Sequence, residues 1–207
     1  IYLYMKIPFY KYHANGNDFI LIYENDLKSS SYTFKKTHLN KNRIEQMCDR
    51  STGVGADGLL YINKQTKHDF ALDYYNSDGS YETFCANGSR CAAKFMHDKK
   101  HVSQTMRFKT GAGIHFAKIC TDGVIDMEMI IPKYLVKSVS FLSTNGFLLN
   151  SGARHFVYPS ENLNDDYILP IAKKIRYAKI FEPRGVNINF YKKIDQNRVL
   201  ITTYEKG

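Results

Sequence analysis

Residues 76–91 read NSDGSYETFCANGSRC and combine a turn, a cysteine and the start of a helix. The turn is Asn76-Ser77-Asp78-Gly79, and Cys85 comes soon after it, directly before Ala86-Asn87-Gly88. From Asn87 to Asp98, apolar side chains recur at helical spacing. A cysteine at the start of a helix faces backbone N–H groups without helical partners, and these favour the thiolate over the thiol.

The same N–H groups can hold a carboxylate, and this predicts a type of reaction. A carboxylate bound at Asn87 and Gly88 would place the adjacent α-carbon over the sulfur of Cys85, which suits removal of the α-proton. The competing interpretation is that Cys85 is a buried packing residue, as cysteines outside disulfides commonly are. Cys91 lies on the apolar face of the helix, and we expect it in the core.

The composition is that of an ordinary globular protein with a basic balance. The chain has 207 residues, 43% of them hydrophobic, and a formal net charge of +9. Its basic residues are scattered, so we expect no nucleic-acid partner. No long apolar run predicts a membrane span, and no signal-peptide pattern opens the sequence. The four cysteines show no metal-binding spacing and fit a reducing cytoplasm; they are Cys48, Cys85, Cys91 and Cys120.

Short strand-like stretches dominate the chain and predict an α+β protein. They are rich in β-branched and aromatic residues, and we expect strands at 19–23, 58–62, 70–75, 106–109, 114–119, 124–131, 147–149, 155–158, 186–191 and 198–204. Helical spacing of apolar residues predicts three helices, at 40–49, 87–98 and 169–180.

A weak internal repeat indicates two halves of similar design. NDFILI at 17–22 resembles RHFVYP at 154–159, an offset of 137 residues. GADGLLY at 55–61 resembles GVNINFY at 185–191, an offset of 130, and Asn76 resembles Glu205, an offset of 129. We therefore expect two lobes, at 1–120 and 121–207. The last offset also predicts a counterpart of Cys85 near position 214, beyond Gly207.

Five stretches together resemble the diaminopimelate epimerase family. NSDGSYETFCANGSRC resembles its cysteine signature, N-x-D-G-S-x-x-x-x-C-G-N-G-x-R-C. Four more stretches resemble other segments of the family and occur in the same order. They are HANGNDFILI (13–22), DRSTGVGADGLL (49–60), RGVNINF (184–190) and TTYEKG (202–207). The cysteine signature is specific, and the other segments are individually weak but correctly ordered. The resemblance covers essentially the whole chain, from His13 to Gly207.

This resemblance implies two pseudo-symmetric α/β lobes, each a mostly antiparallel, barrel-like sheet around a central helix, with the active site in the cleft between them. It implies an isomerase that interconverts LL- and meso-diaminopimelate without pyridoxal phosphate or a metal, for lysine and peptidoglycan precursors. Two cysteines act on opposite faces of the α-carbon, one removing a proton as thiolate and the other donating one as thiol. The expected partners are the amino-acid substrate and a second copy in a homodimer, with no nucleic acid and no membrane.

Residue by residue, the resemblance assigns roles in catalysis and binding. Cys85 corresponds to the first cysteine base, and Glu205 to the acidic residue near the α-ammonium group. The positions expected to bind or shape the substrate site are Asn17, Asn76, Ala86, Asn87, Gly88, His155, Asn187 and Lys206. Each has a structural alternative when taken singly. The asparagines can be turn residues, His155 a structural histidine, and Glu205 and Lys206 a solvated pair.

Three departures from the family pattern concern substrate recognition. Ala86 replaces a glycine, Ala153-Arg154 stand where x-Pro is usual before His155, and Lys206 replaces an arginine that would hold a carboxylate bidentately. The second cysteine of the family is expected near position 214, so we expect the protein to continue beyond Gly207.

Other functions stay open at this point. A racemase or isomerase of the same fold, acting on another amino acid, would fit the three departures. A non-catalytic binding protein or inactive fragment would keep the carboxylate site without the second cysteine. A cysteine hydrolase using Cys85 with His13 or His155 is disfavoured, because no nucleophile signature surrounds the thiol.

Overall fold

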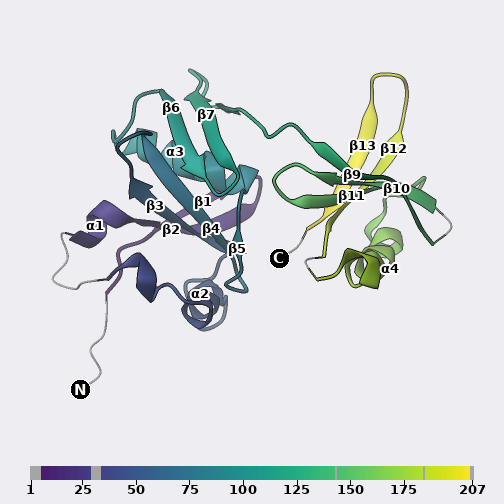
Figure 1. Cartoon of the computed structure of the whole chain (residues 1–207), viewed down its shortest axis with the longest axis horizontal. Coiled ribbons are helices and arrows are strands. Elements are labelled where there is room, and N and C mark those ends of the chain that lie inside the picture. The colour runs from purple at the N-terminus through teal and green to yellow at the C-terminus, as the bar shows by residue number, and fades with distance from the viewer. Residues whose placement is uncertain (1–5, 29–33, 143, 184, 206–207) are drawn as a thin grey trace. The chain divides into compact units, whose positions relative to one another are not determined.

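A computed structural model describes residues 6–28, 34–142, 144–183 and 185–205 of the protein. The chain forms two compact units, of which the first ends at Met129 and the second begins at Ile130 (Figure 1). Each unit has its own sheet and its own hydrophobic core.

The first unit is built on an eight-stranded mixed sheet. Its order is β1-β2-β3-β4-β6-β7-β8, with β5 beside β4. The pairs β2/β3 and β4/β6 are parallel, and the other pairs are antiparallel. The strands are β1 (Tyr10–Ala14), β2 (Asn17–Tyr23), β3 (Gly58–Lys64), β4 (Phe70–Asn76), β5 (Tyr81–Glu82), β6 (Thr105–Thr110), β7 (Gly113–Ile119) and β8 (Ile125–Met127). Because β8 pairs with β7, this unit continues past residue 120.

Helix α3 (Ala86–Asp98) lies inside this sheet. It contacts β1 at one edge and β8 at the other, so the sheet curls around it. Its Phe95 is surrounded by aromatic rings, with centroids at 4.7 Å for Tyr10, 5.9 Å for Tyr12 and 5.7 Å for Tyr23. The predicted barrel-like sheet around a central helix is confirmed for this unit.

Helix α2 (Lys41–Cys48) covers the opposite face of the sheet. Its Ile44 is buried with Ile20 and Leu59 in a second core. Asn40 caps the helix by accepting a hydrogen bond from the N–H of Arg43 at 3.0 Å. This helix agrees with the one predicted at 40–49.

The second unit has a five-stranded sheet in the order β13-β12-β11-β10-β9. β11 and β12 are parallel, and the other neighbours are antiparallel. Helix α4 (Asp165–Arg176) buries Ile168, Ala172 and Ile175 in the core of this unit. The strands are β9 (Lys133–Phe141), β10 (Thr144–Asn150), β11 (Arg154–Pro159), β12 (Asn187–Lys193) and β13 (Val199–Tyr204).

The structure corrects several predicted boundaries. Helix α4 begins at Asp165 and not at 169, because Asp165 and Asp166 suit the positive end of a helix, and it continues through Pro170. It ends at Arg176, before the 3₁₀ turn η2 (Lys179–Phe181). The strand predicted at 124–131 is reduced to β8. Elements that the sequence analysis did not predict are β1, β5, β9, α1 (Glu24–Lys28) and η1 (Lys36–His38).

The two sheets repeat one arrangement of four strands. β1-β2-β3-β4 pair antiparallel, parallel and antiparallel, and β10-β11-β12-β13 pair in the same way. Helix α2 packs on the sheet face that carries Ile20 and Leu59, and helix α4 packs on the face that carries Phe156 and Ile188. If the two helices are equivalent, Ile20 therefore corresponds to Phe156 and Leu59 to Ile188. These correspondences give sequence offsets of 136 and 129 residues. The pairing of β3 with β4 and of β12 with β13 gives an offset of 129 for the last strand as well. A shift of one residue turns every side chain of a strand to the other face, so the predicted offsets of 137 and 130 were wrong.

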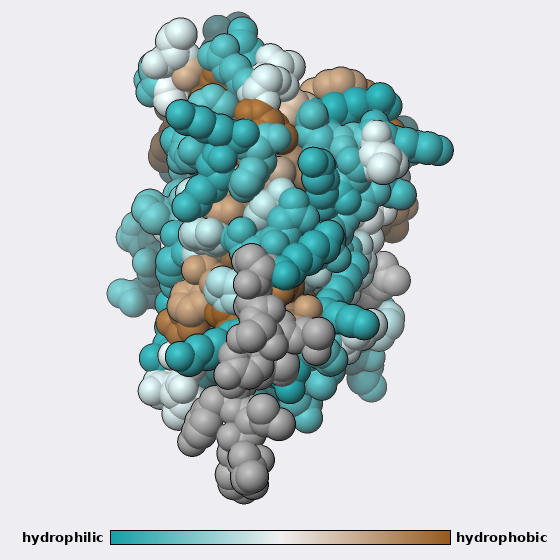
Figure 2. All heavy atoms as spheres, turned by 90° about the vertical axis from the view of Figure 1, so that its left-hand side faces the viewer, coloured by the Kyte–Doolittle hydropathy of each residue, from teal (hydrophilic) through white to brown (hydrophobic). Residues whose placement is uncertain are grey.

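The molecular surface drawn in Figure 2 is covered mainly by hydrophilic side chains, with apolar patches between them. Among the described residues, no helix is both long enough and apolar enough to cross a membrane.

His115 on β7 is a buried histidine of the first unit. It is 3% exposed, its Nε2 lies 2.9 Å from Oγ1 of Thr110, and its ring stacks on Phe84 at 4.6 Å. Burial lowers the pKa of His115 below its ordinary value, because the charged ring would be poorly solvated. The folded state therefore favours the neutral ring.

We expect acidification to destabilise the protein through His115. Because its folded-state pKa is the lower one, the unfolded chain binds more protons, and the free energy of unfolding falls as pH drops below about 6.5. In urea unfolding between about pH 7.5 and about pH 5.5, His115→Gln should show a smaller decrease than the wild type. His101→Gln, at an exposed position, is the control and should keep the full pH dependence. An undiminished decrease in His115→Gln would contradict the prediction.

Candidate active site

Cys85 is the N-cap residue of α3, with extended backbone angles of φ −138° and ψ 117°. Its Sγ accepts a hydrogen bond from the backbone N–H of Gly88 at 3.4 Å. The side chain is only partly buried, whereas Gly88 and Ser89 are buried. A sulfur held by a backbone N–H at the positive end of a helix is stabilised as the thiolate. Cys85 also packs against the core cluster around α3, so both of its roles agree with the structure and its reactivity stays a prediction.

The backbone N–H groups at the start of α3 differ in the partners that they meet. The N–H of Ser89 donates to the carbonyl of Cys85 at 2.8 Å. The N–H of Gly88, which we expected to hold a substrate carboxylate, is directed at Sγ of Cys85. Within the helix, the N–H groups of Ala86 and Asn87 have no carbonyl four residues earlier, which leaves them for an anion.

Gly88 has no room for a side chain. A Cβ atom at this position would lie 2.8 Å from Cδ2 of Leu60 and 3.6 Å from Sγ of Cys85. The missing side chain lets α3 approach β3 closely while the N–H of Gly88 still reaches the sulfur.

We expect Gly88→Ala to lower both stability and the rate of α-proton exchange. The added methyl group must displace Leu60 or the helix, which costs about 1–3 kcal/mol of the free energy of unfolding. The displaced N–H then loses its contact with Sγ of Cys85. Urea unfolding and deuterium exchange on the substrate measure the two effects.

Ser89→Ala is the matched control for this variant, because it changes the next residue of the same helix. The buried Oγ of Ser89 has no hydrogen-bond partner among the described residues, so its removal should leave both quantities close to wild type. Wild-type stability and exchange in Gly88→Ala would show that the close contact is not required.

Cys48 and Cys91 are buried, whereas Cys85 is only partly buried. Cys91 is 2% exposed and belongs to the core around α3, as predicted. Burial raises the pKa of Cys91 to about 12 and that of Cys48 to about 11. Both thiols therefore stay protonated near neutral pH. None of the four cysteines forms a disulfide.

The turn between β1 and β2 lies beside the start of α3. Asn15 and Gly16 have positive φ angles of 54° and 84°, as a tight Asn-Gly hairpin requires. Nδ2 of Asn15 lies 3.5 Å from Oδ1 of Asn87. Asn17 begins β2 directly after this turn and donates its Nδ2 to Asp57 at 2.9 Å. The segments that carry Asn17 and Cys85 are therefore neighbours.

Asn76 ends β4 and is 5% exposed. Its Oδ1 accepts from the hydroxyl of Tyr74 at 2.6 Å, and its Nδ2 donates to Oγ of Ser80 at 2.9 Å. These bonds close the turn that leads to β5. They give Asn76 the structural role considered as an alternative, and its contact with substrate stays a prediction.

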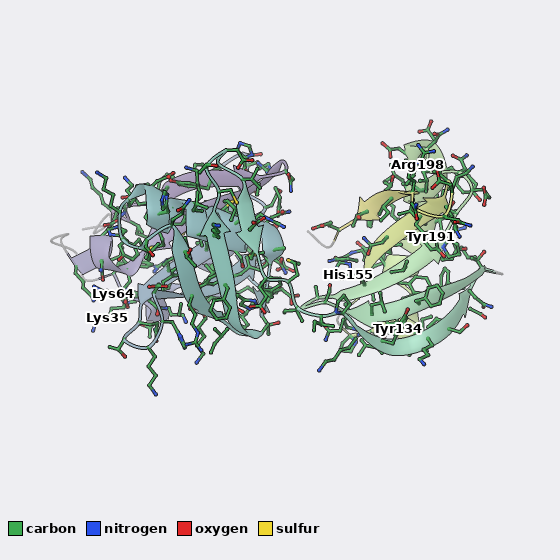
Figure 3. All side chains as sticks on the ribbon, turned by 90° about the horizontal axis from the view of Figure 1, so that it is seen from above. Lys35, Lys64, Tyr134, His155, Tyr191 and Arg198 are labelled. Atoms are coloured by element: carbon green, nitrogen blue, oxygen red, sulfur yellow. The ribbon has the colours of Figure 1, made fainter. Side chains whose placement is uncertain are left out.

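In the second unit, His155 and Asn187 lie opposite one another on β11 and β12. Nδ1 of His155 is 2.8 Å from Oδ1 of Asn189, and Nδ2 of Asn189 donates to Oγ1 of Thr203 at 2.8 Å. Because an amide oxygen only accepts, Nδ1 of His155 carries a proton in this arrangement. Figure 3 labels His155 on the sheet of the second unit, and its contact with a substrate stays a prediction.

The predicted site residues fall in two groups. Those of the first unit are Asn17, Asn76, Cys85, Ala86, Asn87 and Gly88; those of the second are His155, Asn187 and Glu205. Glu205 is exposed just after β13, and Lys206 lies outside the described residues. In the part of the chain that the structure describes, no group of three or more His, Cys, Asp or Glu side chains could hold a metal ion.

A comparison with known families decides which proteins this fold and thiol belong with. The family model described as "Diaminopimelate epimerase" matches residues 9–132, which include the first sheet and α3. The chain belongs to the diaminopimelate epimerase family. The resemblance inferred from the motifs is thereby confirmed.

Curated members of the diaminopimelate epimerase family match nearly the whole chain. The diaminopimelate epimerase of Aquifex aeolicus (strain VF5) is 32% identical over 97% of this chain and 74% of its own length. That of Campylobacter jejuni (serotype O:2, strain NCTC 11168) is 36% identical over the same shares of the two chains. The chain therefore spans about three quarters of the length of these relatives.

Solved structures with related folds are more distant in sequence from this member of the diaminopimelate epimerase family. A probable proline racemase from Agrobacterium radiobacter has a TM-score of 0.69 and 12% identity, covering 96% of this chain and 70% of its own. A phenazine biosynthesis protein of the PhzF family from Bacillus anthracis has a TM-score of 0.64 and 13% identity, covering 97% and 72%. These likenesses confirm the predicted α+β fold.

Asn189 and Asp57, which hold the side chains of His155 and Asn17, are not among the predicted site residues. Asn189 is two residues from Asn187 on the same strand and therefore on the same face, which was the available signal. Asp57 meets Asn17 through the pairing of β2 with β3, and no local pattern indicates such a contact.

Proposed function

We propose that this chain interconverts LL- and meso-diaminopimelate by inverting one α-carbon, without pyridoxal phosphate. The observation that supports this best is the thiol of Cys85 at the start of α3, with the N–H of Gly88 3.4 Å from its sulfur. An α-proton is weakly acidic, so its removal needs a positioned base and stabilisation of the charge that develops on the carboxylate. The start of α3 offers both within one helical turn.

The proposed reaction begins with the α-carboxylate at the N–H groups of Ala86 and Asn87. The thiolate of Cys85 takes the α-proton and becomes a thiol, and the electron pair left on the α-carbon is shared with the carboxylate. A second acid then donates a proton to the opposite face, which inverts the centre. We propose a second cysteine as that acid, as the family resemblance implies. In the reverse direction, the thiol of Cys85 donates and the second group removes the proton.

The remaining predicted residues are proposed to recognise the other groups of the substrate. Glu205 suits an ammonium group because it is negatively charged, and Lys206 suits the distal carboxylate. Asn17, Asn76, His155 and Asn187 supply hydrogen-bonding groups. The absence of disulfides among the cysteines supports a reducing compartment, and we propose the cytoplasm.

The deciding experiment uses protein from the complete gene, incubated with LL-diaminopimelate in D₂O. Proton NMR follows deuterium entering the α-position, and chiral chromatography follows the meso isomer. We expect both to occur. No exchange from folded and reduced protein would reject the proposed function.

A second candidate is an epimerase of the same fold that acts on another amino acid. Ala153, Arg154 and Lys206 depart from the family pattern where substrate contacts are expected. One solved neighbour with 14% identity and a TM-score of 0.64 is titled a hydroxyproline epimerase. α-Proton exchange on another amino acid, with none on diaminopimelate, would favour this candidate.

A further inference from the structure

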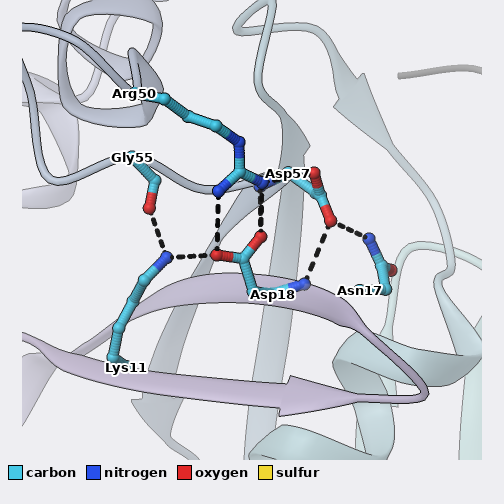
Figure 4. A network of polar contacts seen from close by, with 6 residues as sticks. All are labelled: Lys11, Asn17, Asp18, Arg50, Gly55 and Asp57. Atoms are coloured by element: carbon cyan, nitrogen blue, oxygen red, sulfur yellow. Dashed lines mark hydrogen bonds and ion pairs between the residues drawn. The ribbon is translucent and has the colours of Figure 1, made fainter.

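A network of charged groups in the first unit ends at Asn17 (Figure 4). The guanidinium of Arg50 bridges two carboxylates, 2.7 Å from Asp18 and 2.7 Å from Asp57. Lys11 pairs with the same carboxylate of Asp18 at 2.7 Å. It also donates to the carbonyl of Gly55. The network thus links β1, β2 and the loop before β3.

Stability alone does not explain this network. The side chain of Arg50 is 60% exposed and that of Lys11 is 38% exposed, and ion pairs at such positions contribute little. The carboxyl group of Asp18 is nevertheless ionised at neutral pH, because the hydrogen bond from Arg50 holds the pKa of Asp18 well below its usual range. What the network does impose is the position of Asp57.

Asp57 in turn determines how the carboxamide of Asn17 is oriented. Oδ1 of Asp57 is held by Arg50. Oδ2 accepts from Nδ2 of Asn17 at 2.9 Å and from the N–H of Asp18 at 3.1 Å. An ionised carboxylate has no proton to donate, so the NH₂ group of Asn17 must face Asp57. The carbonyl oxygen of the carboxamide then faces away from Asp57, as Figure 4 shows.

We propose that Asp57 is a positioning residue that presents Oδ1 of Asn17 to the substrate as an acceptor, so that Asn17 binds an ammonium group and not a carboxylate. This inference rests on the proposed function. A carboxamide without such a neighbour can offer either its donor or its acceptor end, and Asp57 removes that choice. Carboxylates are left to N–H donors such as those of Ala86 and Asn87, on the neighbouring segment. The two kinds of charged group on an amino acid therefore meet different groups of the protein.

The test compares two ligands with the same carbon chain and carboxylates. LL-diaminopimelate carries two ammonium groups, and pimelate carries none. Titration calorimetry on the full-length protein gives the Kd of each for the wild type, Asp57→Ala, Asp57→Asn and Asn17→Ala. The Kd of pimelate divided by that of diaminopimelate measures what the ammonium groups contribute to binding.

We expect Asp57→Ala and Asn17→Ala to reduce this ratio by about tenfold or more, since each disturbs a hydrogen bond to a charged group. Asp57→Asn should keep most of the ratio, because its amide oxygen can still accept from Nδ2 of Asn17 while the exposed Arg50 moves aside. Asp73→Ala is the matched control. It breaks another surface ion pair, with Lys36, and should keep the whole ratio.

If Asp57→Ala and Asn17→Ala weakened the binding of both ligands equally, the inference would be overturned. Asn17 would then bind a carboxylate or contribute only to the stability of the fold. An unchanged ratio would overturn it as well. Circular dichroism checks folding, and if Asp57→Ala does not fold, Asn17→Ala and Asp57→Asn decide by the same criteria. A wild-type protein that binds no diaminopimelate would instead count against the proposed function.

Discussion

Cys85→Ala should reduce α-deuterium exchange on diaminopimelate by about a hundredfold to ten-thousandfold, the usual contribution of a general base. No buried cysteine can replace it, since the raised pKa values of Cys48 and Cys91 keep their thiols protonated. Because Cys85 is only partly buried, the variant should fold, and urea unfolding checks this. Cys85→Ser should be similarly inactive, because a serine hydroxyl ionises far less readily than a thiol.

The matched control for this loss is Cys120→Ala. Cys120 is also only partly buried, but it follows strand β7 and does not begin a helix, and its Sγ lies 3.4 Å from Oδ2 of Asp126. This variant should exchange the α-proton at the wild-type rate. A wild-type rate in Cys85→Ala would remove the thiol from the mechanism, whatever the control shows.

Phe95→Ala should lower the free energy of unfolding by about 3–5 kcal/mol, the cost of removing a fully buried aromatic ring. Phe95 is 0% exposed and contacts the rings of Tyr10, Tyr12 and Tyr23. Since domains are stable by only about 5–15 kcal/mol, the variant should unfold at a much lower urea concentration.

Phe116→Ala provides the comparison, because the same side chain is removed from a site that is 48% exposed. The guanidinium carbon of Arg107 lies 5.7 Å from the centroid of the Phe116 ring. Removing this ring should lower the free energy of unfolding by about 1 kcal/mol or less. Equal losses of stability in the two variants would contradict the central place of α3 in the core.

The central helix could be predicted from the sequence because its signals are local. The helix expected at 87–98 is observed at Ala86–Asp98, and Cys91, Phe95 and Met96 are buried as their spacing indicated. The thiol at its start could be recognised in the same way, since a cysteine followed by Asn-Gly needs no knowledge of distant residues. The family motifs could be recognised for the same reason, because they too are contiguous.

Features that depend on distant contacts could not be predicted. Strand β9 is exposed along most of its length and shows no alternation of buried and exposed residues. The bond between Asn17 and Asp57 requires the register of β2 on β3. The repeat was found, but two of its offsets were wrong by one residue, because apolar side chains occur on both faces of the buried strands β2 and β3.

The enclosure of α3 has a consequence for biogenesis. The helix contacts β1, which precedes it in the chain, and β7 and β8, which follow it. A polypeptide that leaves the ribosome from its N-terminus therefore exposes the apolar face of α3 until Met127 has emerged. Contacts between segments so far apart in the chain form slowly and leave apolar surface open to aggregation. The surroundings of Cys85 are thus completed only after β8 has emerged, and a chain interrupted before β8 carries the thiol signature without the complete first sheet.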